Sequence, residues 1–260
     1  MKIAFYQMKI EWENKFKNYI KAENAIKEAV ENKTEILFFP EMSFTGFSMN
    51  IKVTSESNYE TVKFISQLCK RYKIAVGFGW TERYYDKAKN CYSIVDKNGE
   101  EISRYIKIHP FSYGGEDKYF IKGDKLKYFT IGNTTFSTAI CYDLRFPELF
   151  QGICKYDKTD VIVVPANWPA KRSEHWRVLT TARAIENQVY IIAVNCVGNI
   201  GELQYTGNSY VITPNGEIIC QAIDNKEMIC YVDIDFNTEK YRNLFPVKND
   251  RQIEFYKSII

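Results

Sequence analysis

Histidine is scarce in this sequence, with only two in 260 residues. The seven cysteines are odd in number, and no two of them have the Cys-x-x-Cys spacing; they are Cys69, Cys91, Cys141, Cys154, Cys196, Cys220 and Cys230. Disulfide frameworks and structural zinc sites need paired cysteines or clustered histidines. The sequence therefore argues against both, and we expect no metal and no cofactor.

Long apolar stretches and blocks of like charge are also missing. No segment is long enough to span a bilayer, and residues 1–7 read as a strand rather than as part of a signal peptide. The 35 basic and 32 acidic residues are spread along the chain and give a net charge of +3. We therefore expect a cytoplasmic protein with no membrane and no nucleic-acid partner.

Size and periodicity favour one α/β domain over residues 1–260. With 45% hydrophobic residues the chain can bury one sizeable core. Apolar residues recur at helical spacing over 16–30 and 62–72, and an apolar strand follows each of these segments. Segments 93–100 and 210–217 both turn on Asn-Gly, which is typical of β-hairpins. Their likeness predicts two similar halves with one sheet each, and thus a four-layer α-β-β-α sandwich.

Two further expectations concern the second half of the chain. A helix is predicted to run to Asn187, with Ser173 as its cap and a structural ion pair between Arg183 and Glu186 at i,i+3. Residues 235–260 show no clear pattern, and we hypothesise that they pack on a partner subunit.

The most informative segment is the apolar run over 135–140, which stops at Cys141. Its β-branched and aromatic residues predict a buried strand, and apolar residues at helical spacing predict a helix over 145–156. Cys141 would then face a helix N-terminus, which lowers a thiol pKa and offers N–H groups to an oxyanion. The alternative is a buried structural cysteine, a common place for free cysteine.

Two other reactive residue types also follow apolar strands. Glu41 comes after the strand at 36–40, and Lys107 comes after the strand at 102–106. In isolation each could be an ordinary solvated side chain. Because α/β folds place reactive groups at strand ends, we expect Glu41, Lys107 and Cys141 to form one site.

These residues and their neighbours resemble the motifs of the nitrilase or carbon-nitrogen hydrolase superfamily. The matching segments are Phe39–Met42 around the glutamate, Tyr105–His109 around the lysine and Ile140–Glu148 around the cysteine. The resemblance covers nearly the whole chain. It implies the four-layer sandwich fold and a homodimer.

The resemblance also implies a role for each residue. Cys141 would attack an amide carbon, and Glu41 would act as the general base. Lys107 and the backbone N–H of Tyr142 would hold the oxyanion. A second glutamate, Glu116, would hydrogen-bond Lys107 and position the substrate amide; its alternative is a solvated loop carboxylate.

Two more segments, Gly115–Phe120 and Ala166–Trp176, are similar to the omega-amidase branch. That branch hydrolyses the side amide of 2-oxo-dicarboxylic acid monoamides such as 2-oxoglutaramate. The partners implied are a small amide and water. The resemblance implies that Asn167 and Trp168 bind the substrate and that a cation holds its acid end.

Arg145 is our candidate for that cation, because it lies four residues after Cys141. A guanidinium group binds a carboxylate through two parallel hydrogen bonds. The alternative is a structural pair with Glu148 at i,i+3. If Arg145 is structural, the next candidates are Arg172, Tyr113 and Tyr119.

Three other functions remain open at this point. A papain-like hydrolase would pair Cys141 with His109 or His175. An acyltransferase, or another amidase or nitrilase, would use the same Glu-Lys-Cys site. A non-catalytic binding protein would keep the fold without turnover.

Overall fold

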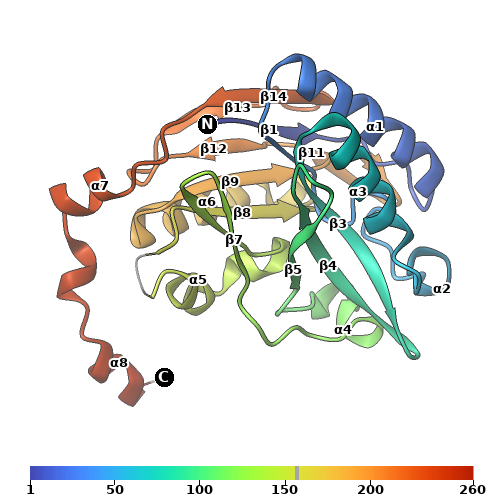
Figure 1. Cartoon of the computed structure of the whole chain (residues 1–260). Helices are drawn as coiled ribbons and strands as arrows, with labels where there is room; N and C mark the ends of the chain where they lie inside the picture. Colours follow the sequence, from blue (N-terminus) through green and yellow to red (C-terminus); the bar gives the residue numbers. More distant parts are fainter. Residues whose placement is uncertain (156–157, 260) are drawn as a thin grey trace.

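The computed structural model describes residues 1–155 and 158–259; residues 156, 157 and 260 lie outside the described part. It contains two six-stranded sheets and a separate two-stranded one (Figure 1). The first sheet consists, in spatial order, of β14 (Met228–Asp233), β1 (Lys2–Gln7), β2 (Ile36–Phe38), β3 (Ala75–Tyr84), β4 (Lys87–Val95) and β5 (Glu101–Ile106).

The second sheet consists, in spatial order, of β13 (Ile218–Gln221), β12 (Tyr210–Ile212), β9 (Tyr190–Asn195), β8 (Val161–Ala166), β7 (Thr134–Thr138) and β6 (Tyr128–Ile131). It has the same pattern of parallel and antiparallel strands as the first, although its edge strand β6 is joined to the sheet differently from β14. In each sheet three consecutive strands are parallel, β1-β2-β3 and β7-β8-β9, and antiparallel strands flank them. The two predicted halves are therefore present, except that the first sheet takes its edge strand β14 from the second half of the chain.

The two sheets pack face to face, and helices cover their outer faces. Phe38 of β2 and Phe136 of β7 meet between the sheets, with ring centroids 6.1 Å apart. On the other face of the first sheet, Leu37 shares a buried cluster with Ile26 and Ile65. The covering helices are α1 (Lys15–Glu31) and α3 (Glu60–Tyr72) on the first sheet, and α5 (Pro147–Ile153) and α6 (Ser173–Asn187) on the second (Figure 1). The predicted four-layer sandwich is confirmed.

Short elements connect these layers and line the site. They are α2 (Ile51–Thr54), α4 (Glu116–Tyr119), the hairpin strands β10 (Val197–Ile200) and β11 (Leu203–Thr206), and the 3₁₀ turns η1 (Ser112–Gly114), η2 (Cys141–Arg145) and η3 (Ala170–Arg172). The C-terminal segment forms α7 (Glu239–Leu244), the 3₁₀ turn η4 (Val247–Asp250) and α8 (Ile253–Ile259) at one side of the molecule (Figure 1). Tyr241 of α7 packs against Tyr190 of β9.

Both Asn-Gly hairpins form as predicted. The turn of β4 and β5 has Gly99 at φ +86°, and the turn of β12 and β13 has Gly216 at φ +83°. Both angles lie in the left-handed region, which glycine adopts at little cost. These turns explain why the two hairpins could be located from the sequence.

Two helix predictions need correction. The helix expected over 145–156 is shorter: Pro147 starts α5, which ends at Ile153, and Tyr156 lies outside the described residues. Ser173 is the first helical residue of α6 and makes no capping bond; Arg172 occupies the cap position. The 3₁₀ turn η3 leads directly into the helix, and the backbone N–H of Ser173 donates a hydrogen bond to the carbonyl of Ala170 in that turn.

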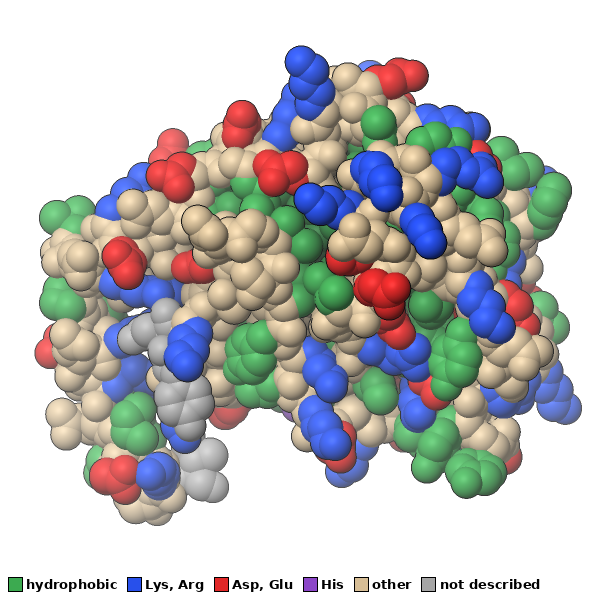
Figure 2. Space-filling model, in the orientation of Figure 1, with side chains coloured by type: hydrophobic (Ala, Val, Ile, Leu, Met, Phe, Trp, Pro, Cys, Tyr) green, Lys and Arg blue, Asp and Glu red, His purple; other side chains and the backbone are tan. Residues whose placement is uncertain are grey.

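The charged side chains are mixed over the face shown in Figure 2. Lysine and arginine side chains alternate there with aspartate and glutamate, and apolar side chains lie between them. Within the part of the chain that the structure describes, no helix is both long and apolar enough to cross a membrane.

Candidate active site

The structure brings the four predicted catalytic residues together between the sheets. Glu41 follows β2, Lys107 follows β5, Cys141 opens η2 after β7, and Glu116 opens α4. The first three lie just beyond the ends of strands, and all four are at most 9% exposed. Glu116 is thus not a solvated loop carboxylate.

Lys107 joins the two glutamates. Its Nζ lies 2.8 Å from Glu41 Oε1 and 2.8 Å from Glu116 Oε2. Burial alone would lower the pKa of Lys107. The charges of the Glu116 and Glu41 carboxylates together have the larger effect, and the pKa of the ammonium is raised. Burial also raises the pKa of Glu116, although the charge of Lys107 opposes this rise. A lysine whose charged form is favoured therefore lies between two buried carboxyl groups.

Cys141 has an environment different from the one that the sequence predicted. Burial and the charge of Glu41 raise the pKa of the Cys141 thiol well above its ordinary value, and Lys107 offsets them only in part. The expected lowering by a helix N-terminus is wrong, because η2 is a short 3₁₀ turn with few aligned peptide groups. The thiol is the favoured form, so a base must take its proton before it reacts.

The turn that carries Cys141 is held by Asp143. Cys141 has φ +46°, an unusual value for a residue other than glycine. The carboxylate of Asp143 accepts hydrogen bonds from Ile140 N at 2.9 Å and from Tyr105 Oη at 2.7 Å. It also accepts from the backbone N–H of His109 at 2.9 Å. These bonds fix the strained turn to the end of β5.

The two histidines do not contact the nucleophile. His109 Nδ1 lies 2.7 Å from Asp143 Oδ1, and His175 Nδ1 lies 3.4 Å from an Arg145 nitrogen. Neither ring has a hydrogen bond to Cys141 among the described residues. The geometry therefore gives no support to a papain-like Cys-His pair.

Asn167, expected to bind substrate, also holds Glu41. Its backbone N–H donates to Glu41 Oε2 at 2.9 Å, and its Nδ2 donates to the Glu41 carbonyl at 2.6 Å. Its own carbonyl oxygen lies 3.9 Å from Cys141 Sγ. Asn167 thus links Glu41 and Cys141 from the end of β8.

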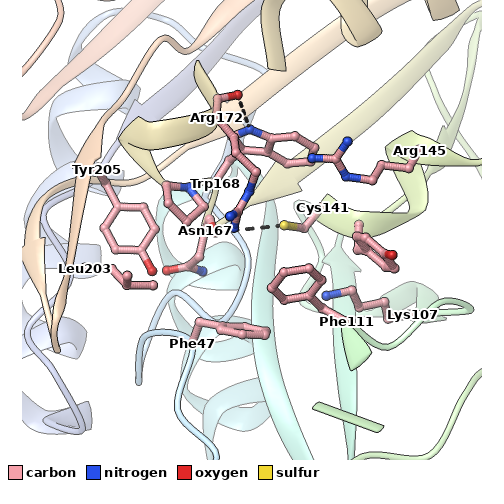
Figure 3. Close-up of a pocket in the computed structure, with 12 residues that line it drawn as sticks. Phe47, Lys107, Phe111, Cys141, Arg145, Asn167, Trp168, Arg172, Leu203 and Tyr205 are labelled. Carbon is pink, nitrogen blue, oxygen red and sulfur yellow. Dashed lines mark hydrogen bonds between the residues drawn. The ribbon is translucent and has the colours of Figure 1, made fainter. Parts of the chain in front are cut away.

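A small cavity of about 40 Å³ opens onto Cys141 and Lys107 (Figure 3). It is lined by Phe47, Lys107, Phe111, Cys141, Tyr142, Arg145, Asn167, Trp168, Pro169, Arg172, Leu203 and Tyr205. All four residues that we expected to bind substrate, Tyr142, Arg145, Asn167 and Trp168, therefore face this cavity. The hairpin of β10 and β11 contributes Leu203 and Tyr205, which the sequence did not suggest.

Arg145 and Arg172 both lie on aromatic rings at this cavity. The guanidinium of Arg145 is 4.8 Å from the ring centroid of Trp168, and that of Arg172 is 5.5 Å from the ring centroid of Phe111. Burial and the nearby charge of Arg172 lower the pKa of Arg145. The alternative pair of Arg145 with Glu148 is absent from the salt bridges of the described residues.

Two of the substitute candidates for substrate binding lie elsewhere. Tyr113 is 87% exposed and Tyr119 is 42% exposed, and neither lines the cavity. Arg172 is therefore the remaining substitute.

Sequence reasoning missed Asn90 and Asp143. Asn90 lies on β4, where it is 1% exposed and bonds both glutamates. No clear sequence signal pointed to Asn90, because β4 also carries two lysines and a serine. Asp143 stood in the cysteine motif, but its partners Tyr105 and His109 come from a distant segment.

Comparison with known proteins agrees with this geometry. The carbon-nitrogen hydrolase family model matches residues 2–242. The chain is 29% identical over 263 residues to a Staphylococcus aureus protein named hydrolase in agr operon, covering 99% of this chain and 100% of that protein. It is 29% identical over 258 residues to the 2-oxoglutaramate amidase of Bacillus subtilis, covering 98% of each chain.

Among solved structures, XC1258 from Xanthomonas campestris, described as a CN-hydrolase superfamily protein, superimposes with a TM-score of 0.90. That match has 25% sequence identity and covers 97% of each chain. Because the family model spans nearly the whole chain and the fold agrees along its length, this protein belongs to the carbon-nitrogen hydrolase family.

Proposed function

We propose that this enzyme hydrolyses the side amide of small 2-oxo-dicarboxylic acid monoamides, such as 2-oxoglutaramate, to the acid and ammonia. The observation that carries the proposal is the pair of arginines, Arg145 and Arg172, at the cavity that ends on Cys141 (Figure 3). Neither guanidinium has a carboxylate partner among the described residues; their neighbours are aromatic rings and His175. Guanidinium groups without a carboxylate partner near an amide-cleaving thiol suit a substrate with a carboxylate at its other end.

The size and lining of the cavity favour a small acyl group. Phe47 and Phe111 narrow it on one side and Tyr205 on the other (Figure 3). A cavity of about 40 Å³ suits a short acyl chain better than a bulky one. The name of the Bacillus subtilis relative, 2-oxoglutaramate amidase, supports the same substrate class.

In the first half of the reaction, Glu41 takes the thiol proton as Cys141 Sγ attacks the amide carbon. The carbonyl oxygen becomes an oxyanion, which the ammonium of Lys107 and the backbone N–H of Tyr142 stabilise. The C–N bond then breaks, and Glu41 returns its proton to the leaving nitrogen. Ammonia departs, and the acyl group remains on Cys141 as a thioester.

In the second half, Glu41 takes a proton from water as the water oxygen attacks the thioester carbon. The same two donors hold the second oxyanion. The C–S bond breaks, the acid product leaves, and the proton returns from Glu41 to Cys141. Glu116 keeps Lys107 oriented throughout, through the 2.8 Å bond to its Nζ.

An amide panel tests this proposal. Purified protein should release ammonia from 2-oxoglutaramate and 2-oxosuccinamate faster than from glutamine, asparagine or a simple nitrile. Hydroxylamine added during turnover should trap the acyl group as the hydroxamate. Ammonia release without hydroxamate would argue against the thioester, and a preference for uncharged amides would argue against the acid-end contact. Transfer of the acyl group to an added amine in preference to water would favour an acyltransferase.

We further propose that the enzyme acts in the cytoplasm as a homodimer. The C-terminal segment supports pairing, because Leu244, Phe245 and Phe255 are each at least 60% exposed. Exposed apolar side chains gathered on one segment often mark an interface.

A further inference from the structure

Asn90 contacts three of the four residues that we place in the mechanism. Its Nδ2 donates to Glu41 Oε1 at 2.7 Å and to Glu116 Oε1 at 2.9 Å. Its backbone carbonyl accepts the N–H of Lys107 at 2.9 Å, where the chain leaves β5. Asn90 therefore touches the base, the second glutamate and the lysine from a single position on β4.

The side chain of Asn90 has only one workable orientation. Its Oδ1 is buried without a hydrogen-bond partner among the described residues, although unpaired buried oxygens are uncommon. Turning the amide over would place that oxygen against the carboxylates of Glu41 and Glu116. The two hydrogen bonds from Nδ2 thus stabilise this orientation by more than the missing hydrogen bond to Oδ1 costs.

The charge balance explains why these donors matter. Glu41 and Glu116 share one cation, Lys107, so when both carboxyl groups are ionised the buried cluster has one negative charge more than Lys107 can pair. The other titratable groups around Glu41 are the thiols of Cys141 and Cys196 and the phenol of Tyr205, and none of them is cationic. Asn90 is the donor that the structure records for Glu116 Oε1. Hydrogen bonds to a carboxylate favour its ionised form.

We propose that Asn90 is a positioning residue that holds Glu41 and Glu116 apart and ionised, so that Glu41 can accept the proton of Cys141. The role rests on the proposed function, since it serves the same proton transfer. It differs from a purely structural role because it acts on protonation. Removing the amide should therefore shift the pH dependence of the reaction as well as its rate.

The test compares Asn90→Ala and Asn90→Asp with a matched control, Thr81→Val. Thr81 pairs with Asn90 across β3 and β4, is 2% exposed, and also has an unpartnered side-chain oxygen, Oγ1. Its side chain has no hydrogen bond to Glu41 or Glu116 among the described residues. Thr81→Val therefore disturbs the same part of the sheet without removing a hydrogen bond to either carboxylate.

Without the amide donors, the ionised forms of Glu41 and Glu116 lose stabilisation, and the pKa of each carboxyl group rises. The acid limb of the pH profile of kcat/KM should therefore move to higher pH. We expect a move of about one pH unit in Asn90→Ala and a larger one in Asn90→Asp, where a third carboxylate joins the pair. At neutral pH kcat should fall by roughly tenfold or more, while KM changes little because Asn90 does not line the cavity. Thr81→Val should keep the wild-type profile.

A second readout does not depend on turnover. The rate at which iodoacetamide alkylates Cys141, followed by peptide mass spectrometry across the same pH range, should show the same shift toward higher pH in both Asn90 variants. An unchanged acid limb and alkylation profile in folded variants would overturn the proposal. So would a failure of both Asn90 variants to fold where Thr81→Val folds, since that points to a structural role. Wild-type protein that releases no ammonia would refute the proposed function, and the alkylation profiles would then decide the role of Asn90 alone.

Discussion

The guanidinium of Arg183 donates two hydrogen bonds to the carbonyl oxygen of Leu144, from Nε at 3.2 Å and from Nη2 at 2.9 Å. Arg183 lies on α6, and Leu144 lies in the turn that begins at Cys141. The ion pair predicted with Glu186 is also present, at 3.1 Å. The outer helix therefore anchors the nucleophile turn through a residue that we expected to be merely structural.

Replacing this anchor should cost stability. Arg183→Lys removes the planar fork, so at least one buried bond to Leu144 is lost, and we expect the free energy of unfolding to fall by about 1.5–3 kcal/mol. Urea denaturation measures the loss. The matched control is Arg177→Lys, on the same helix, where the pair with Glu174 is exposed to solvent and should contribute little to stability. Equal losses in the two variants would contradict the anchoring role.

Cys141→Ala should abolish ammonia release and leave the fold intact, because the thiol is the proposed nucleophile and alanine fits its space. Circular dichroism checks the fold, and an ammonia assay checks turnover. Cys220→Ala, at a half-buried position away from the cavity, should retain activity. More than a small residual activity in Cys141→Ala would exclude the proposed mechanism.

Arg145→Lys should lower kcat/KM for dicarboxylic monoamides while sparing slow hydrolysis of uncharged amides. Lysine keeps the charge but loses the two parallel bonds that a guanidinium makes to a carboxylate, and one charge-assisted bond is typically worth about 1.5–3 kcal/mol, or roughly tenfold to a hundredfold. The measurement is the ratio of the two kcat/KM values. If both values fall together, or neither falls, the carboxylate is bound elsewhere, and Arg172→Lys becomes the variant to assay.

Activity should survive treatment with EDTA. The proposed mechanism uses a thiol, two carboxyl groups and an ammonium, and it routes no step through a metal. The ammonia assay before and after dialysis against the chelator is sufficient. Loss of activity that zinc restores would place the chemistry in another class.

The purified protein should have the mass of a dimer in light scattering at micromolar concentration. Shortening the chain after Thr238, at the start of α7, should weaken pairing if the exposed apolar residues of the C-terminal segment form the contact. A monomeric mass for the full chain would contradict the homodimer. A dimer that survives the truncation would place its interface on another surface.

The sequence by itself determined the local elements and the ends of strands at which reactive residues lie. Periodicity located the helices that became α1 and α3, and the two Asn-Gly turns located both hairpins. Such features depend on residues close together in the chain, so they can be read from it. The motif resemblance then indicated that Glu41, Lys107, Glu116 and Cys141 belong to one site.

Only the tertiary structure decided the state of that site. Glu41 forms hydrogen bonds with Asn90, which is 49 residues away in the sequence, and with Asn167, which is 126 residues away. The pKa of Cys141 is raised because folding buries it beside Glu41, whereas the local pattern alone suggested a lowered value. Burial and charge pairing arise when distant segments pack together, and neither quantity is a property of any short stretch of sequence.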